Sequence, residues 1–174
     1  MGKNNDGKAP LYKGWTSFRP DVAHLHAVLE FQGDAGIGVH LDGSGLIDLE
    51  GDTEEGEAIL ERLCQGIEFP CYRSKKSRHR LFQSHEAVEY LKIVDLGIEV
   101  RAGFHQSVLP PSVVVGEERT EYKWLVSPYD CPPPPLPQHI LAFYLEHAAN
   151  PKNAKEAGPR QQAKPGPAPL ARRS

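Results

Sequence analysis

The fold is decided by residues 45–52, Gly45-Leu46-Ile47-Asp48-Leu49-Glu50-Gly51-Asp52. Apolar residues interleaved with acids between glycines predict a short strand rather than a helix. Side chains two residues apart on a strand point to the same face, so Asp48 and Glu50 should lie side by side. Adjacent carboxylates repel each other unless they are protonated or bridged by cations, and divalent metal ions are the usual bridge. A surface strand with two solvated acids is the other interpretation that this stretch leaves open.

The sequence on either side predicts how this strand is embedded. Residues 36–41 alternate like a strand and reach the acidic strand through Asp42-Gly43-Ser44-Gly45, which predicts a hairpin. Residues 53–64 carry acids in their first turn and an apolar stripe, and Gly66 follows just past their end. This pattern predicts a helix directly after the acidic strand.

The periodicity of the remaining chain predicts further elements. They are a helix over 22–29, an extended segment over 69–73, a short helix over 84–92, a strand over 97–101, a closing hairpin over 113–126, and an amphipathic helix that contains Ile140, Leu141, Tyr144, Leu145 and Ala148. In the strand over 97–101, Ile98 and Val100 should face one side of a sheet, and Glu99 and Arg101 the other. Glu99 can therefore join Asp48 and Glu50 if the two strands are neighbours.

Basic residues gather in the run Arg73-Ser74-Lys75-Lys76-Ser77-Arg78-His79-Arg80. A solvated turn is one interpretation of such a run. The other is a cradle for phosphates, in which Lys and Arg side chains flank a histidine that can donate to a phosphate oxygen. The run alone does not decide between the two.

Composition sets the domain organisation that we expect. The chain has 174 residues, enough for one domain with its own core, and 39% of them are hydrophobic. Beyond position 150 large apolar residues almost disappear, which predicts disorder. We therefore expect a flexible N-terminus over 1–9, a folded domain over 10–149 and a disordered, basic Pro/Ala tail over 150–174.

Charge and apolar runs narrow the location and the partners. The formal net charge of -3 does not by itself indicate a nucleic-acid or membrane partner, although acids at a metal site are neutralised locally. No apolar run is long enough to span a bilayer, and no signal-peptide pattern occurs. The three cysteines lack C-x-x-C spacing. We therefore expect reduced thiols without structural zinc, a cytoplasmic location and no membrane partner.

Three signals follow one another along the chain. They are the acid-x-acid pair Asp48 and Glu50 on a strand, Ser77-x-His79 beside basic residues, and Glu99 between apolar strand residues. This series resembles the archaeo-eukaryotic primase superfamily, and specifically the N-terminal primase-polymerase domain of plasmid, phage and bacterial replication proteins. The segment Val108-Leu109-Pro110-Pro111-Ser112 looks like the signature turn of that family. The resemblance covers residues 10–144.

The resemblance implies an α+β fold, with a mixed or antiparallel central sheet flanked by helices and an RRM-like catalytic core. It implies a nucleotidyltransferase that adds NTPs or dNTPs to a primer or initiating strand on a single-stranded DNA template, by two-metal phosphoryl transfer. A helicase or another replication protein is the kind of partner it implies. The roles it implies are Asp48, Glu50 and Glu99 as catalytic ligands of Mg²⁺ or Mn²⁺, and Ser77, His79, Arg73, Arg80 and Ser112 as nucleotide-binding residues.

Two other functions stay open on the sequence. One is a metal-dependent nuclease or phosphoesterase that uses the same acids together with His79 or His105. The other is a non-catalytic module of the same fold that binds nucleotides or nucleic acid.

Overall fold

A computed structural model describes residues 14–17, 23, 36–115 and 119–154 of the protein. In chain order the elements are η1 Trp15–Ser17, β1 Ile37–His40, α2 Leu41–Ser44, β2 Leu46–Gly51, α3 Glu54–Leu63, β3 Cys71–Arg73, β4 Arg78–Gln83, β5 Leu91–Ile93, η2 Val94–Leu96, β6 Ile98–Arg101, β7 Gln106–Leu109, β8 Val113–Val115, β9 Arg119–Glu121, β10 Lys123–Val126, α4 Gln138–Ala148 and α5 Pro151–Ala154. The helix predicted over 22–29 falls almost entirely outside the described residues.

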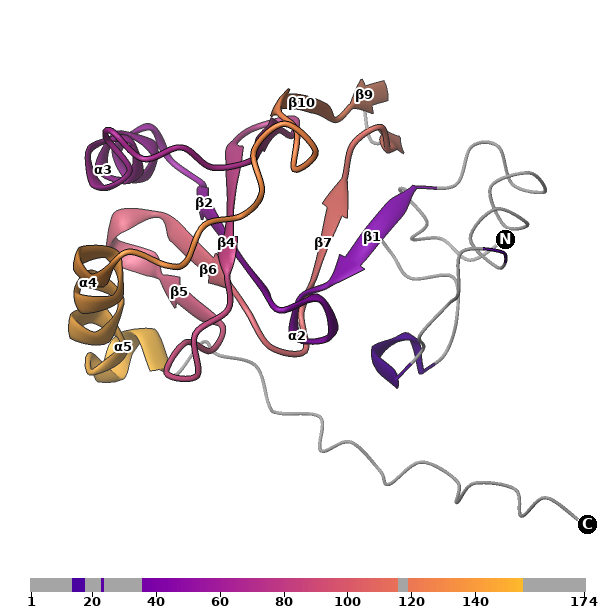
Figure 1. Cartoon of the computed structure of the whole chain (residues 1–174). Coiled ribbons are helices and arrows are strands. Elements are labelled where there is room, and N and C mark those ends of the chain that lie inside the picture. The colour runs from indigo at the N-terminus through magenta and orange to yellow at the C-terminus, as the bar shows by residue number, and fades with distance from the viewer. Residues whose placement is uncertain (1–13, 18–22, 24–35, 116–118, 155–174) are drawn as a thin grey trace, which may run out of the picture.

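The centre of the molecule is a six-stranded sheet in the order β10-β3-β4-β2-β6-β5, and every neighbouring pair is antiparallel. Helices α3 and α4 lie on one side of this sheet, and the β1–β7 ribbon lies on the other side (Figure 1). The predicted α+β class with an antiparallel central sheet is confirmed. So is the predicted acidic strand, which forms β2 between β4 and β6.

Strict alternation along β2 separates the core from the polar face of the sheet. Ile47 and Leu49 are buried in the main hydrophobic cluster with residues of α3 and α4, such as Leu60 and Ile140. Asp48 and Glu50 therefore face the opposite side. A one-residue slip of β2 would place both carboxylates in the apolar core, so burial of Ile47 and Leu49 fixes the register of the acids.

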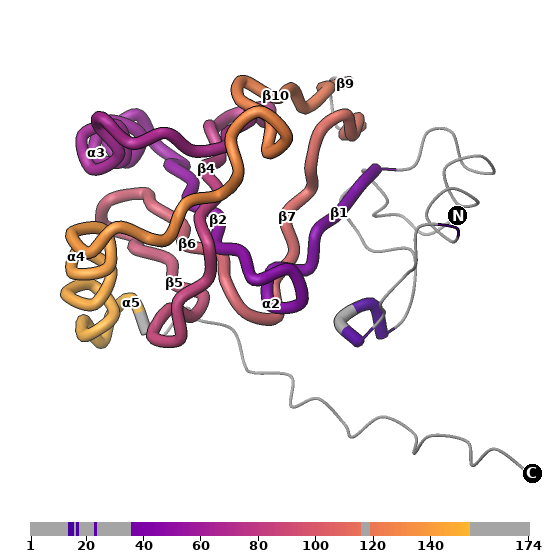
Figure 2. Tube along the Cα trace, viewed as in Figure 1, coloured from indigo at the N-terminus to yellow at the C-terminus, as the bar shows by residue number. Residues whose placement is uncertain are grey.

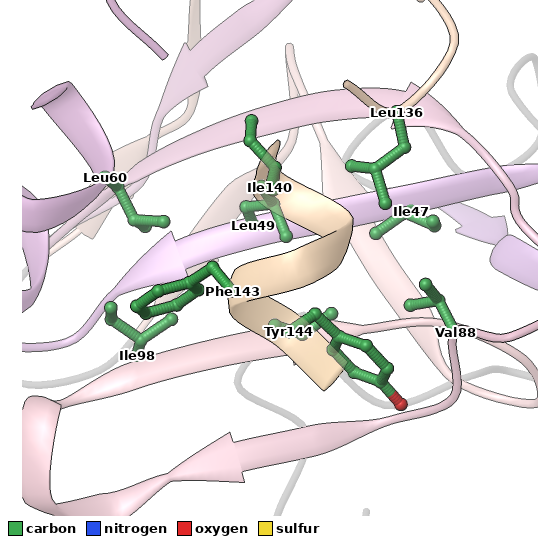
Figure 3. Close-up of a pocket in the computed structure, with 10 residues that line it drawn as sticks. Ile47, Leu49, Leu60, Val88, Ile98, Leu136, Ile140, Phe143 and Tyr144 are labelled. Atoms are coloured by element: carbon green, nitrogen blue, oxygen red, sulfur yellow. The ribbon is translucent and has the colours of Figure 1, made fainter. Parts of the chain in front are cut away.

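Helix α4 covers the reverse side of β2, as its amphipathic pattern predicts. Ile140, Leu141 and Tyr144 are buried against the sheet, whereas Leu145 is exposed. Figure 2 shows the chain running from β10 across the sheet to reach α4. A small apolar cavity remains between α4 and the sheet, and Figure 3 shows the side chains that line it.

Glycines allow α3 to begin close to the sheet. The helix starts at the N-cap Thr53, whose hydroxyl accepts a hydrogen bond of 3.0 Å from the Gly56 amide. A Cβ added at Gly56 would lie 2.4 Å from the carbonyl oxygen of Gly97. Only a residue without a side chain allows this approach, which places the first turn of α3 against the turn that precedes β6.

This contact leads to a prediction about stability. Gly56→Ala should destabilise the protein by about 1–3 kcal/mol, because the new methyl group overlaps backbone atoms that cannot move freely. The sign is diagnostic, since a Gly to Ala change in an unconstrained helix stabilises by roughly 0.4–1 kcal/mol. Urea unfolding measures the effect, and Glu61→Ala on the exposed side of α3 should change stability by less than about 0.5 kcal/mol. A stabilised Gly56→Ala variant would contradict the prediction.

The predicted hairpin between residues 36–41 and the acidic strand is wrong. Strand β1 pairs with β7, with Ile37 opposite Leu109 and His40 opposite Gln106. The turn residues instead form the short helix α2, whose Leu41 amide donates to the carbonyl of His105 at 3.0 Å. Glycines and Asp in the connection are equally compatible with a hairpin turn and with this helical turn, so local sequence did not identify the partner strand.

Two further predictions need correction. The short helix predicted over 84–92, with Ala87, Val88 and Leu91 facing inward, is wrong, because the chain makes a turn there and enters β5. Val88 and Leu91 are nevertheless buried, whereas Ala87 is exposed. The hairpin predicted over 113–126 is only partly right. Strands β8 and β9 form it, whereas β10 pairs with β3 at the edge of the central sheet.

The described chain continues past residue 149, where the expected folded domain ends. Helix α5 follows α4, and its Asn153 is buried, with its Nδ2 donating to the carbonyl of His147 at 3.1 Å. Across the described residues, no helix combines the length and the hydropathy that crossing a membrane requires.

Candidate active site

Polar side chains gather on the face of the sheet opposite α3 and α4. The register places Glu50 opposite His79 of β4 on one side and opposite Glu99 of β6 on the other. Asp48 stands opposite Arg101 in the same way. Because residues paired across strands share a face, the structure brings the three predicted carboxylates and the predicted histidine together.

Asp48 is the buried centre of a hydrogen-bond network. Its carboxylate is 0% exposed, and its Oδ2 lies 2.9 Å from Nδ1 of His79. The hydroxyl of Tyr72 donates to the same oxygen at 3.2 Å, and the hydroxyl of Ser107 donates to it from β7. The His79 ring also stacks on Tyr72, with 4.4 Å between ring centroids. This network fixes the imidazole and ties the β1–β7 ribbon to the sheet.

The Asp48–His79 contact is an ion pair. Burial opposes ionisation of Asp48, but the charge and hydrogen bond of His79, together with Arg101 and Ser107, bring the pKa of Asp48 below its ordinary value. Burial likewise lowers the pKa of His79, but Asp48 and Glu50 outweigh it and the pKa of His79 is raised. Since Asp48 holds Nδ1, the second ring nitrogen Nε2 is left facing Glu50, whose Oε1 lies 3.4 Å away.

The ion pair predicts a pH dependence of stability. His79 has an ordinary pKa of 6.5, so its stabilising contribution is complete below that pH and is lost as pH rises through the higher folded pKa. Asp48 has an ordinary pKa of 3.8, and its contribution is lost as pH falls through the lower folded pKa. Above pH 6.5, the free energy of unfolding should therefore fall as His79 loses its proton, by at most about 1.4 kcal/mol per pH unit.

Urea unfolding across a pH series measures this dependence. Asp48→Asn should remove the decline above pH 6.5, because His79 then loses the charge that raises its pKa. A wild-type stability that keeps rising through this range, or a decline that Asp48→Asn leaves unchanged, would contradict the assignment.

A second group of acids lies next to this pair. Glu50, Asp52 and Glu99 each offer a carboxylate oxygen, and these atoms lie within 4.8 Å of one another. Carboxylate oxygens are the ligands that Mg²⁺ and Mn²⁺ prefer, and the Asp52 side chain is 37% exposed, so the trio has an open side. The donor set fits a hard divalent cation. Sequence reasoning missed Asp52, although it continues the same period-two series as Asp48 and Glu50.

Basic side chains neutralise this trio. The Arg101 guanidinium approaches Glu99 with Nε at 3.0 Å from Oε1, and its Nη2 lies 2.6 Å from Oε2 of Glu50. Lys92 Nζ lies 3.8 Å from Oδ2 of Asp52. Burial raises the pKa of Glu99, but Arg101 and the neighbouring Tyr90 and Lys92 more than offset this, so its pKa is lowered and the carboxylate is ionised.

Ser77 is the other predicted residue that reaches the site. It is buried in the turn before β4, and its hydroxyl donates to Oε1 of Glu50. Ser74 bonds to it across the turn, with 3.0 Å between the two hydroxyl oxygens. The Ser-x-His spacing therefore places one side chain on Glu50 and the next on Asp48.

The structure does not bring Arg73 and Arg80 to this face, which corrects the predicted phosphate cradle. The register groups both with Arg78, on the face opposite His79. Arg80 is 0% exposed and forms an ion pair with Glu57 of α3, with Nη2 at 2.5 Å from Oε1. Because β4 alternates, the arginines on either side of His79 must point away from it.

Ser112 also has a structural contact. Its hydroxyl accepts a hydrogen bond of 2.7 Å from the amide of Ile37, and so ties the start of β8 to β1.

His105, which the nuclease interpretation uses, stacks on Tyr90 with 4.0 Å between ring centroids. Burial lowers the pKa of His105.

The profile of the family described as "Bifunctional DNA primase/polymerase, N-terminal" matches residues 4–139. The chain belongs to this family. The match to the primase/polymerase family spans β2, β4 and β6, the strands that carry the acids and His79. No curated protein matches the chain in sequence.

Membership confirms the resemblance read from the three motifs. The primase/polymerase family indicates a metal-dependent nucleotidyltransferase that acts on DNA and nucleotides. The acidic trio, Glu50, Asp52 and Glu99, is the group in the described part of the chain whose geometry suits such a metal.

Proposed function

We propose that this protein is a DNA-directed nucleotidyltransferase. It adds NTPs or dNTPs to a primer or initiating strand on a single-stranded DNA template. The observation that carries the proposal is the convergence of three carboxylates and a histidine, whose pKa Asp48 and Glu50 raise, on one sheet face of a chain of the primase/polymerase family.

Glu50, Asp52 and Glu99 are the residues that would hold a divalent cation, Mg²⁺ or Mn²⁺. Such a cation would supply Lewis acidity for the attack of the 3′-hydroxyl on the α-phosphate and would offset the negative charge of the nucleotide triphosphate. The family resemblance implies that Asp48 belongs with these ligands. Since the Asp48 carboxylate already receives His79, Tyr72 and Ser107, we assign it the positioning of His79.

His79 is proposed to bind the triphosphate of the incoming nucleotide. An imidazolium held at Nδ1 by Asp48 presents its Nε2–H in a fixed direction, and a charged donor makes a stronger hydrogen bond to phosphate than a neutral one. Ser77 supports this arrangement by fixing Glu50 beside the ring. The departing pyrophosphate would remain in contact with His79 and not with Arg73 or Arg80, which lie on the other face.

The experiment supplies a labelled primed template and an unprimed template, each with NTPs or dNTPs and with Mg²⁺ or Mn²⁺. Template-dependent extension that requires the metal is the expected result, and chelation by EDTA should stop it. Shortening of the strand without nucleotides would instead identify a nuclease. Nucleotide binding by calorimetry without incorporation on any template would identify a non-catalytic module. Either of these outcomes would overturn the proposal.

A further inference from the structure

We propose that the Arg101 guanidinium is the counter-ion of the metal site. In the metal-free protein it contacts the carboxylates of Glu50 and Glu99, and it must release them when a divalent cation binds. The inference rests on the proposed function in one respect, namely that Glu50 and Glu99 are metal ligands. It adds a residue outside the three motifs that sets how tightly the site binds metal.

The contacts of Arg101 are the first step of the argument. Its Nε lies 3.0 Å from Oε1 of Glu99 and its Nη2 lies 3.2 Å from Oε2, so the planar fork faces the whole carboxylate. The same Nη2 lies 2.6 Å from Oε2 of Glu50. One guanidinium therefore joins two of the three carboxylates of the trio.

Competition follows from the position of these atoms. A Mg²⁺ ion takes carboxylate oxygens at about 2.0–2.1 Å. A divalent cation bound to Glu50 and Glu99 would have to use the same carboxylate oxygens that the Arg101 guanidinium contacts. The two positive charges would then lie close together in a poorly solvated site, where they repel each other strongly. The side chains of Glu50 and Glu99 are 8% and 14% exposed, so solvent screens this repulsion poorly. Metal and Arg101 cannot both keep these contacts.

Arg101 also has a route out of the site. It is the last residue of β6, and Gly103 with a φ of +61° follows two positions later in the turn to β7. Its side chain is 25% exposed, whereas Asp48 opposite it is fully buried. The guanidinium can therefore turn toward solvent without moving the strand.

Lys92 provides the comparison that isolates this effect. It carries the same charge and stands opposite Glu99 in the sheet, but its Nζ lies 3.8 Å from Asp52 and its side chain is 40% exposed. A general electrostatic effect would make the two basic residues equivalent. If Arg101 competes for the ligand oxygens, its removal should raise the affinity for the metal more than removal of Lys92 does.

The test is a calorimetric titration of the full chain with Mn²⁺, without DNA or nucleotide. Arg101→Gln should bind Mn²⁺ at least about tenfold more tightly than the wild type, because the competing cation is absent. Lys92→Gln should tighten binding by no more than about threefold, since an exposed charge is screened. Glu50→Gln should weaken binding, which establishes that the titrated site is this one.

Thermal unfolding with and without Mn²⁺ gives a second measurement. Metal-free Arg101→Gln should melt below the wild type, because Glu50 and Glu99 lose their counter-ion, and saturating Mn²⁺ should narrow that gap. If Arg101→Gln cannot be purified, Arg101→Lys replaces it, since a lysine cannot fork across both carboxylates and should still tighten binding by about threefold.

Two outcomes would overturn the proposal. Equal or weaker Mn²⁺ binding by the Arg101 variant, beside a wild type that binds and a Glu50→Gln that does not, removes the role of Arg101 and leaves the metal site intact. Absence of Mn²⁺ binding in both the wild type and the Arg101 variant removes the metal site and the inference together.

Discussion

Glu50→Gln is expected to lower the rate of nucleotide incorporation by about a thousandfold, the upper range for loss of one preorganised electrostatic group in an active site. Glutamine has the shape of glutamate but lacks the charge that a divalent cation requires. Glu50 also stands between His79 and Glu99 in the sheet, so its side chain links the Asp48–His79 pair to the acidic trio. Single-turnover primer extension under Mn²⁺ measures the loss.

The matched control for this variant is Glu61→Gln. Glu61 is exposed on α3, on the far side of the sheet, so the same chemical change should leave incorporation within about twofold of the wild type. A folded Glu50→Gln protein that kept more than a tenth of the wild-type rate would show that Glu50 does not hold a catalytic cation.

His79→Gln is expected to lower kcat/KM for the incoming nucleotide by about 10- to 100-fold, which corresponds to the loss of one hydrogen bond to a charged group. The loss should fall mainly on KM for the nucleotide, because glutamine can donate a hydrogen bond but carries no charge. Asp48→Asn should show part of the same loss, because the neutral amide no longer raises the pKa of His79. Steady-state incorporation at varied nucleotide concentration separates KM from kcat.

Tyr72→Phe serves as the comparison for His79. It removes the hydroxyl that donates to Asp48 but keeps the ring on which His79 stacks. We expect less than a tenfold change in KM, since the histidine and its charge remain. If His79→Gln lowers the melting temperature but leaves KM unchanged, the histidine is a structural residue and not a nucleotide contact.

Alternation along single strands is the part of this site that the sequence predicts well. The spacing of Asp48 and Glu50 predicts a shared face, and the apolar neighbours of Glu99 predict its direction. The same rule also applies to residues that were not assigned from it. Asp52 continues the acidic series of β2, and Arg80 must point away from His79 because it is the next residue on the strand.

Pairing between distant strands is the part that local patterns do not determine. Residues 36–41 carry a strand pattern next to a glycine turn, yet β1 pairs with β7 about seventy positions later. Ser107, which stands opposite Val39 in that ribbon, donates to Asp48, and no motif near Ser107 indicates this contact. The roles of Ser107 and Arg101 depend on which strands meet, and this became visible only in three dimensions.

Helix α4 has a practical consequence for anyone who expresses this protein. The family match stops at residue 139, just inside the helix, and Ile140, Leu141 and Tyr144 come after that point. A recombinant fragment that ends at residue 139 would lack these three side chains, and the apolar face of β2 that they cover would be exposed to solvent. Such a fragment would be prone to aggregate. A usable fragment has to extend at least through Asn153.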